Sequence, residues 1–128
     1  MTNELMWLTW AVVLNAIMWV PYILNMIMVR GLVDAVGYST DPKPLAPWAE
    51  RMKKAHYNGV ENLVIFGAAV LIANAAGVTN ETTVLAAQVY VWARVVHVVA
   101  YTAGIPWVRT LAFAVSWLCT VAILLQLI

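Results

Sequence analysis

Residues 50–62 read Glu50-Arg51-Met52-Lys53-Lys54-Ala55-His56-Tyr57-Asn58-Gly59-Val60-Glu61-Asn62, and this polar stretch continues without a proline into the apolar segment 63–76. On a helix, five of its polar side chains recur every three or four residues and therefore share one face. They are Arg51, Lys54, Asn58, Glu61 and Asn62. A carboxylate and amides are costly inside a bilayer unless they face protein or water, so this face is a candidate functional site on a membrane-entering helix.

The composition is that of a membrane protein. Of 128 residues, 64% are hydrophobic and 10% are charged, whereas charged residues make up about a quarter of a soluble domain. The formal net charge of +1 supplies no concentrated basic surface for phosphates, so we expect membrane lipids and no nucleic acid as partners. The single cysteine, Cys119, lies in an apolar run, which predicts a packing role and no metal site.

Four apolar segments are long enough to cross a bilayer as helices. We expect these helices at about residues 5–29, 48–76, 83–103 and 108–127. Pro21 should bend the first helix, and Asn15 and Asn25 should bond to neighbouring helices, as amides in membrane spans usually do. The predicted fold class is therefore all-α, an integral membrane four-helix bundle with one domain over residues 1–128.

The basic residues are distributed asymmetrically. Five of them flank the loop between the first two helices, and Arg109 follows the turn between the last two. The five are Arg30, Lys43, Arg51, Lys53 and Lys54. Because basic loops remain in the cytoplasm, we expect the long first loop and the candidate site there, and both termini on the opposite side.

A second polar group lies in the third helix, where Arg94, His97 and Tyr101 follow at spacings of three and four residues and form one stripe. A guanidinium inside a membrane span needs a carboxylate, and Glu61 is the one carboxylate in the apolar part of the chain. We therefore predict an Arg94–Glu61 ion pair, which could hold the bundle together, line a pocket, or do both. Haem ligation by His56 and His97 is disfavoured because His56 lies at the aqueous mouth and His97 lies deeper on another helix.

The two motifs, Glu50–Asn62 and the Arg94-His97-Tyr101 stripe with Arg109 after it, together resemble a bacterial-type member of the MAPEG family, the membrane-associated proteins in eicosanoid and glutathione metabolism. The resemblance covers essentially the whole chain. It implies a homotrimer in the inner membrane of a bacterium, with glutathione as co-substrate between adjacent subunits at the cytoplasmic side.

Carried over residue by residue, the resemblance implies roles for nine side chains. Those implied to contact glutathione are Asn58, Glu61, Arg94, His97 and Tyr101, and those implied to add positive charge near its carboxylates are Arg30, Arg51 and Lys54. Arg109 matches the arginine beside the glutathione sulfur, and Tyr101 would assist it in catalysis. The chain departs from the pattern at Tyr57, where an arginine is often found, at Lys54, which replaces an arginine, and at Phe113, where a tyrosine can stand.

The function implied is a membrane-bound glutathione transferase, or peroxidase, that activates the thiolate for attack on lipophilic electrophiles or lipid hydroperoxides. A non-catalytic family member that binds a lipid or a protein partner is an alternative, because lysine lacks the bidentate fork that arginine offers a carboxylate. A small multidrug-type transporter is a second alternative. That class needs a carboxylate in the first helix, and here Glu4 precedes the apolar segment.

Overall fold

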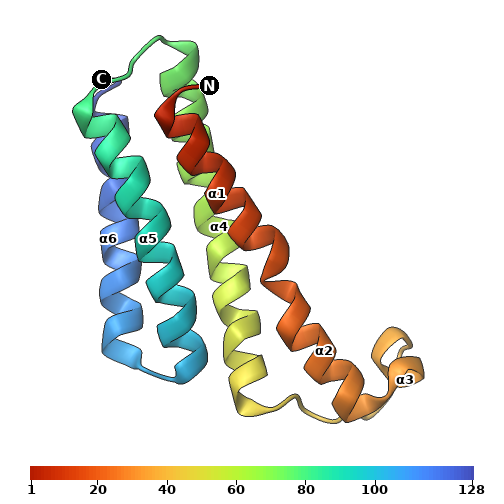
Figure 1. Ribbon diagram of the computed structural model, residues 1–128. Helices are drawn as coiled ribbons and strands as arrows, with labels where there is room; N and C mark the ends of the chain where they lie inside the picture. Colours follow the sequence, from red (N-terminus) through yellow and green to blue (C-terminus); the bar gives the residue numbers. More distant parts are fainter.

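The computed structural model describes all 128 residues and contains helices but no strands (Figure 1). The elements are α1 (Asn3–Ile17), α2 (Trp19–Arg30), α3 (Leu32–Val36), α4 (Pro47–Ala75), α5 (Glu81–Ala103) and α6 (Pro106–Leu125). Four helical stretches are long and apolar enough to cross a membrane, and α1 and α2 together make the first. The prediction of an all-α fold with four membrane spans is therefore confirmed.

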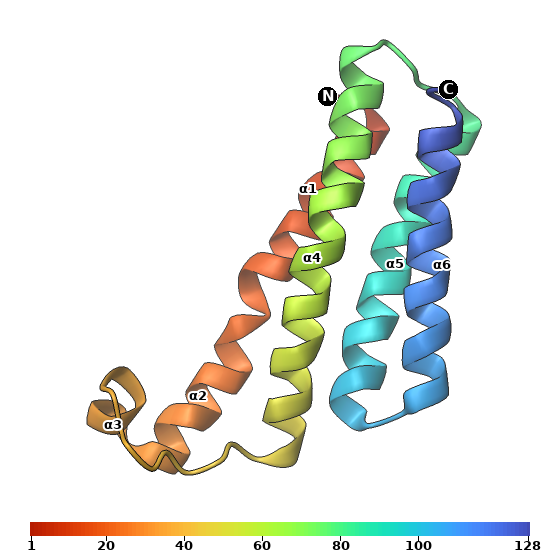
Figure 2. The ribbon, with the colours of Figure 1, turned by 180° about the vertical axis from the view of Figure 1, so that it is seen from behind.

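The helices run alternately up and down (Figures 1 and 2). Both chain termini and the turn between α4 and α5 lie at one end of the bundle, which we call the terminal end. The long loop between α2 and α4 and the turn between α5 and α6 lie at the other, which we call the loop end. Every basic side chain except that of Arg94 thus belongs to the loop end.

The first span is broken at Met18, between α1 and α2. Pro21 has no backbone N–H, so the carbonyl of Ile17 loses its helical donor and α1 ends there. The break lets the two halves of the span take different neighbours. α1 packs against α4 and α5, whereas α2 packs against α3 and α4 and does not reach α5.

The main core lies in the half of the bundle nearest the terminal end. It contains Ala11, Phe66, Ala69, Val70, Ala73, Ala86, Ala87, Tyr90, Val91, Cys119 and Ile123. Alanines let the helix backbones approach closely, and the rings of Phe66 and Tyr90 stack with centroids 3.6 Å apart. Only 28 of 128 residues are buried, and large apolar side chains on all four spans point outward, which is the surface expected of helices surrounded by lipid.

The expectation that the two asparagines of the first span bond to neighbouring helices is wrong. Asn15 donates from Nδ2 to the carbonyl of Ala11 in its own helix, at 2.8 Å. Asn25 does not bond to a neighbouring helix; its Oδ1 accepts from the backbone N–H of Ala46, 2.9 Å away, and so fastens the end of the long loop. Arg30 acts similarly, donating from Nε to the carbonyl of Lys43 at 2.7 Å. The first helix begins at Asn3, two residues before the predicted position, so Glu4 lies in the first turn of α1, where it is 4% exposed.

Candidate functional site

A buried guanidinium connects three helices in the middle of the bundle. Arg94 on α5 is 4% exposed, and its Nη2 donates to Oδ1 of Asn58 on α4 at 2.7 Å. Its Nη1 donates to Oγ of Ser116 on α6 at 3.4 Å. Arg94 also lies 3.3 Å from Nδ1 of His97. Because arginine can only donate, that imidazole nitrogen is the acceptor and Nε2 carries the proton.

Glu61 does not pair with Arg94, and the predicted ion pair is wrong for the single chain. Each residue turns a helix by about 100°, and the side of α4 that faces the bundle is marked by Ala55, Gly59 and Phe66. Glu61 lies on nearly the opposite side and is exposed. Asn58 lies at the edge of the bundle-facing side, so it reaches Arg94 where Glu61 cannot.

The stripe on α5 continues from the buried arginine toward the loop end. The ring of His97, which is 2% exposed, meets the ring of Tyr101 edge-on with centroids 5.6 Å apart. The guanidinium carbon of Arg109, from the first turn of α6, lies 4.7 Å from the centroid of the Tyr101 ring. The structure therefore brings Asn58, Arg94, His97, Tyr101 and Arg109 into one connected line of polar and aromatic side chains.

The other positive side chains named from the sequence lie outside this line. Arg51 donates from Nε to the carbonyl of Thr102 at 2.9 Å, where its charge complements the C-terminal end of the α5 dipole. Lys54 is exposed on α4, and Arg30 is engaged with the long loop. Within one chain, these three cations surround the loop end and do not contact Arg94.

Two contacts at the site were not anticipated from the sequence. Ser116 appears there as one hydroxyl in an apolar run, and only its placement opposite Arg94 shows its role. The phenol oxygen of Tyr22 lies 2.7 Å from Nδ1 of His56 and joins α2 to α4. A tyrosine and a histidine on consecutive predicted helices were the available signal, but nothing in their spacing indicated contact.

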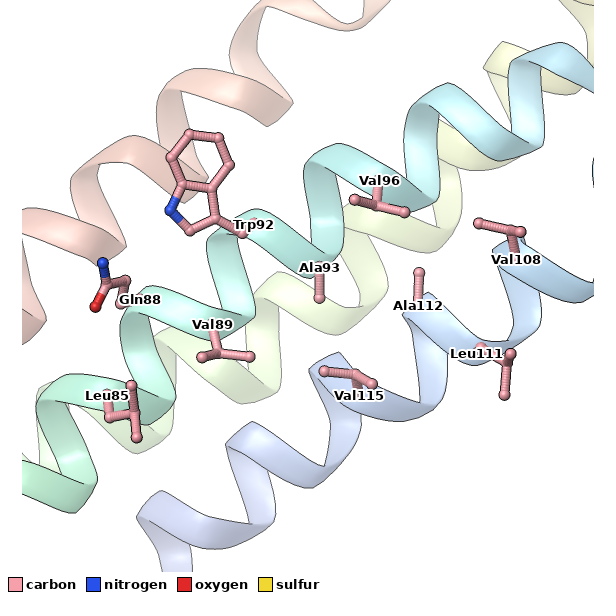
Figure 3. Close-up of a pocket in the computed structure, with 10 residues that line it drawn as sticks. All are labelled: Leu85, Gln88, Val89, Trp92, Ala93, Val96, Val108, Leu111, Ala112 and Val115. Carbon is pink, nitrogen blue, oxygen red and sulfur yellow. The ribbon is translucent and has the colours of Figure 1, made fainter.

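The largest cavity lies elsewhere, in a groove between α5 and α6 (Figure 3). It measures about 580 Å³, and Gln88 is the one polar residue among the ten that line it. Trp92 projects from α5 at one side of the groove, while Leu111 and Val115 line it from α6 (Figure 3). With no acid, base or nucleophile, the groove suits an apolar chain and is separate from the polar line.

Four membrane spans around a buried arginine and histidine, with a half-buried asparagine beside them, define a small multi-pass membrane protein with a polar site inside its bundle. The chain belongs to the MAPEG family, whose model matches residues 6–128. It is similar to microsomal glutathione S-transferase 1 of Bos taurus (32% identical) and of Homo sapiens (31%), each over 80 residues, which are 62% of this chain and 52% of the relative. The chain thus spans about half the length of the curated relatives it matches. No solved structure matches it.

Proposed function

We propose that this protein is a membrane-bound glutathione transferase, with peroxidase activity toward lipid hydroperoxides as a second outcome of the same chemistry. Membership of the MAPEG family and similarity to proteins named microsomal glutathione S-transferase support a glutathione-related membrane function. The observation that carries the proposal is the contact of Arg109 with Tyr101, at the end of the line that begins at buried Arg94.

Glutathione carries two carboxylates, and the chain offers it positive charge without a competing internal anion. Arg94 has three neutral partners and no carboxylate partner in its own chain. Buried guanidinium groups are stabilised by an anion, and a ligand carboxylate would supply it. The proposed binding residues are Arg30, Arg51, Lys54, Asn58, Glu61, Arg94, His97 and Tyr101, of which Arg30, Arg51, Lys54 and Glu61 would have to meet glutathione from outside the polar line.

Thiolate formation is the step in which Arg109 would act. A free thiol has a pKa near 8.5 and is only a few per cent ionised at neutral pH. A guanidinium beside the sulfur stabilises the anion, and each unit by which the thiol pKa falls requires about 1.4 kcal/mol. The phenol of Tyr101, beneath the Arg109 guanidinium, would donate a hydrogen bond to the sulfur or to an electrophile oxygen.

The location of the site explains why such a reaction would take place in a membrane. The electrophile would arrive through the lipid, from which apolar surfaces such as the α5–α6 groove are accessible, while glutathione would arrive from water at the loop end. The basic side chains at that end favour a cytoplasmic orientation, with both termini on the other side and the protein in a bacterial inner membrane. In the assembly proposed here, three copies would complete the sites between adjacent subunits.

The test is a titration of the purified, detergent-solubilised protein with glutathione, followed by difference absorbance in the thiolate band at neutral pH. We expect a saturable thiolate signal for the wild type and its loss in Arg109→Ala. Lys43→Ala is the matched control, because it removes a cation from the same end of the bundle, in an exposed part of the loop. An equal thiolate signal in Arg109→Ala would contradict the role of Arg109.

A non-catalytic member that binds a lipid or a protein partner is the second candidate. Its support is that Lys54 and Glu61 are exposed and lie outside the polar line. Saturable glutathione binding with no thiolate signal, or no binding at all, would favour it over the transferase. The transporter alternative is disfavoured, because Glu4 lies at the extreme end of the first span and not midway along it.

A further inference from the structure

An exposed apolar segment lies at the loop end, outside the polar line and outside the α5–α6 groove. It is formed by residues 31–38, which include α3. Its four large apolar side chains, Leu32, Val33, Val36 and Tyr38, are 62%, 83%, 77% and 105% exposed. Such a run of apolar side chains is unfavourable in water, so it indicates a surface that contacts a membrane or another protein.

The apolar and charged residues of α3 lie on different sides of this short helix. Since each residue turns a helix by about 100°, Leu32, Val33 and Val36 fall within one arc of about 100°. Asp34 lies roughly opposite the centre of that arc. Ala35 is the one residue of α3 that is not exposed, so it faces α2, the one helix that α3 contacts. This amphipathic arrangement is typical of a helix at the boundary between water and lipid.

The position of α3 places it at the surface of the membrane. The chain turns back after α2, so α3 lies beside the last turns of α2, on the side away from α5 and α6 (Figures 1 and 2). In both views α3 lies at about the height of the α5–α6 turn. Trp107, in the first turn of α6, is 77% exposed there. Because exposed tryptophan prefers the level of the lipid headgroups, α3 lies at that level too.

The base of the segment is closed, which keeps the segment at this level. Gly31 has φ +78°, a conformation that glycine adopts readily, and it lets the chain reverse at the end of α2. Beside it, Nε of Arg30 donates to the carbonyl of Lys43 at 2.7 Å, so the two ends of residues 31–42 are joined. The apolar side of α3 therefore needs no membrane affinity of its own, because the first span already holds it at the lipid surface.

We propose that residues 31–38 form an interfacial anchor in the phospholipid leaflet at the loop end. Leu32, Val33 and Val36 would insert among the acyl chains just beneath the headgroups, while Asp34 faces water. Tyr38 would lie among the headgroups, which suit a ring that carries a polar hydroxyl.

Phospholipid is the partner because the segment continues a surface that already faces lipid. Leu24 and Met28, on the last turns of α2, are 55% and 83% exposed, as expected of a membrane span. Lys43 is exposed at the base of the segment and adds positive charge, which attracts anionic headgroups. The anchor would fix the depth and tilt of the first span, a role that is independent of glutathione.

The experiment measures where α3 lies in a bilayer. A cysteine is placed at one position of α3 in the full-length protein, labelled with an environment-sensitive fluorophore, and studied in nanodiscs of phosphatidylcholine and phosphatidylglycerol. Cys119 is buried, so the wild type serves as the labelling blank. The fluorescence is quenched separately by lipid that carries a nitroxide near its headgroup and by acrylamide in the water. For Val33→Cys and Val36→Cys, we expect the nitroxide lipid to remove most of the fluorescence and acrylamide to remove little.

Asp34→Cys is the matched control, because it places the same fluorophore on the same helix but on the opposite side. Acrylamide should quench this label more strongly than the nitroxide lipid does. Three results would overturn the proposal: acrylamide quenching at Val33 and Val36 equal to that at Asp34, protection of the Val33 and Val36 labels from both quenchers by another copy of the protein, or equal nitroxide quenching at all three positions. All three side chains are exposed, so the substitutions disturb no packing, and no step requires glutathione.

Discussion

Arg94 is held in the bundle by neutral groups. Its donors reach an amide oxygen, a hydroxyl and an imidazole nitrogen, so the desolvated charge is solvated by dipoles and not cancelled by an anion. This arrangement satisfies the geometry of the guanidinium while leaving its charge available. A ligand carboxylate near the site would therefore gain more from Arg94 than from an arginine already paired with an internal glutamate.

The space beside this arginine is set by the absence of a side chain at Gly59. A Cβ there would lie 2.6 Å from Oδ1 of Asn15 and 3.7 Å from Nη2 of Arg94. Asn15 is itself fixed, since its Nδ2 donates to the carbonyl of Ala11 at 2.8 Å. We predict that Gly59→Ala lowers the free energy of unfolding by about 1–3 kcal/mol through overpacking, measured by thermal unfolding in detergent.

Gly67 provides the control for this prediction. A Cβ at Gly67 would meet only a methyl carbon of Leu8, at the ordinary contact distance of 3.6 Å, so Gly67→Ala should be neutral or stabilise α4 by up to about 1 kcal/mol. Combining Gly59→Ala with Asn15→Ala removes the clashing oxygen and should recover most of the loss. A double variant as unstable as Gly59→Ala would show that the clash with Asn15 is not the cause.

At the scale of the elements, the helices could be predicted because their apolar length and their breakers are local properties. Pro42 and Pro44 prevent a helix from running through the loop before α4, and Gly104 at φ +78° with Pro106 after it separates α5 from α6. The rotation of α4 about its axis is not local. The polar face of α4 does not coincide with the side that contacts α5. In a membrane span, residues that face lipid and residues that face protein are both apolar, so the sequence does not show which side is buried. The predicted pairing of Glu61 with Arg94 failed for this reason.

The contacts of Glu4 and Asn25 were missed for a related reason. Both side chains bond to groups that become neighbours only when the bundle assembles, namely two threonine hydroxyls and a loop N–H. Asparagine in a membrane span ordinarily indicates a helix–helix contact, but Asn25 is close enough to the end of its span to reach the returning chain. The stripe on α5 was anticipated because three of its members lie on one helix and need no partner to define it.

The start of α5 depends on a reciprocal cap. Asn80 accepts from the backbone N–H of Thr83 at 3.0 Å, and Thr83 returns the contact by accepting from the N–H of Asn80 at 2.9 Å. The helix therefore starts at Glu81, two residues before the predicted start at residue 83. We predict that Asn80→Ala lowers the free energy of unfolding by about 1–2 kcal/mol, measured by thermal unfolding in detergent.

Thr82→Ala is the comparison for this cap. Thr82 lies between the two capping residues but is exposed and makes no side-chain hydrogen bond, so its replacement should change stability by less than about 0.5 kcal/mol. Similar losses for Asn80→Ala and Thr82→Ala would mean that the cap does not determine where α5 begins. Because Thr83 also donates to Glu4, the same cap helps to position the Glu4 carboxylate.

The whole molecule has two chemically different ends. The loop end carries six of the seven basic residues, whereas the terminal end carries Glu4 and Glu81 and no basic side chain. Apolar surface separates them on every span. This polarity favours one orientation of the bundle across a bilayer, and the basic loop end is the face at which the proposed anionic co-substrate would bind.

In the isolated chain, the Glu61 carboxylate makes no hydrogen bond or ion pair. Glu61 is exposed in a part of α4 whose neighbours Val60 and Val64 are exposed and apolar. A carboxylate facing lipid is strongly unfavourable, so this side of α4 should face protein of another copy, as the proposed homotrimer requires. We predict that wild-type protein gives, by native mass spectrometry, three times the 14.1 kDa mass of one chain.

Glu61→Leu tests whether this side chain faces another subunit or lipid. If Glu61 faces another subunit, leucine removes polar contacts and the proportion of trimer should fall, whereas a lipid-facing position would make the same change stabilising because it removes a charge from the bilayer. Glu81→Leu, at the exposed terminal end, should leave the assembly unchanged. A wild-type mass of one chain, or a Glu61→Leu trimer as stable as the wild type, would contradict an interface at this side of α4.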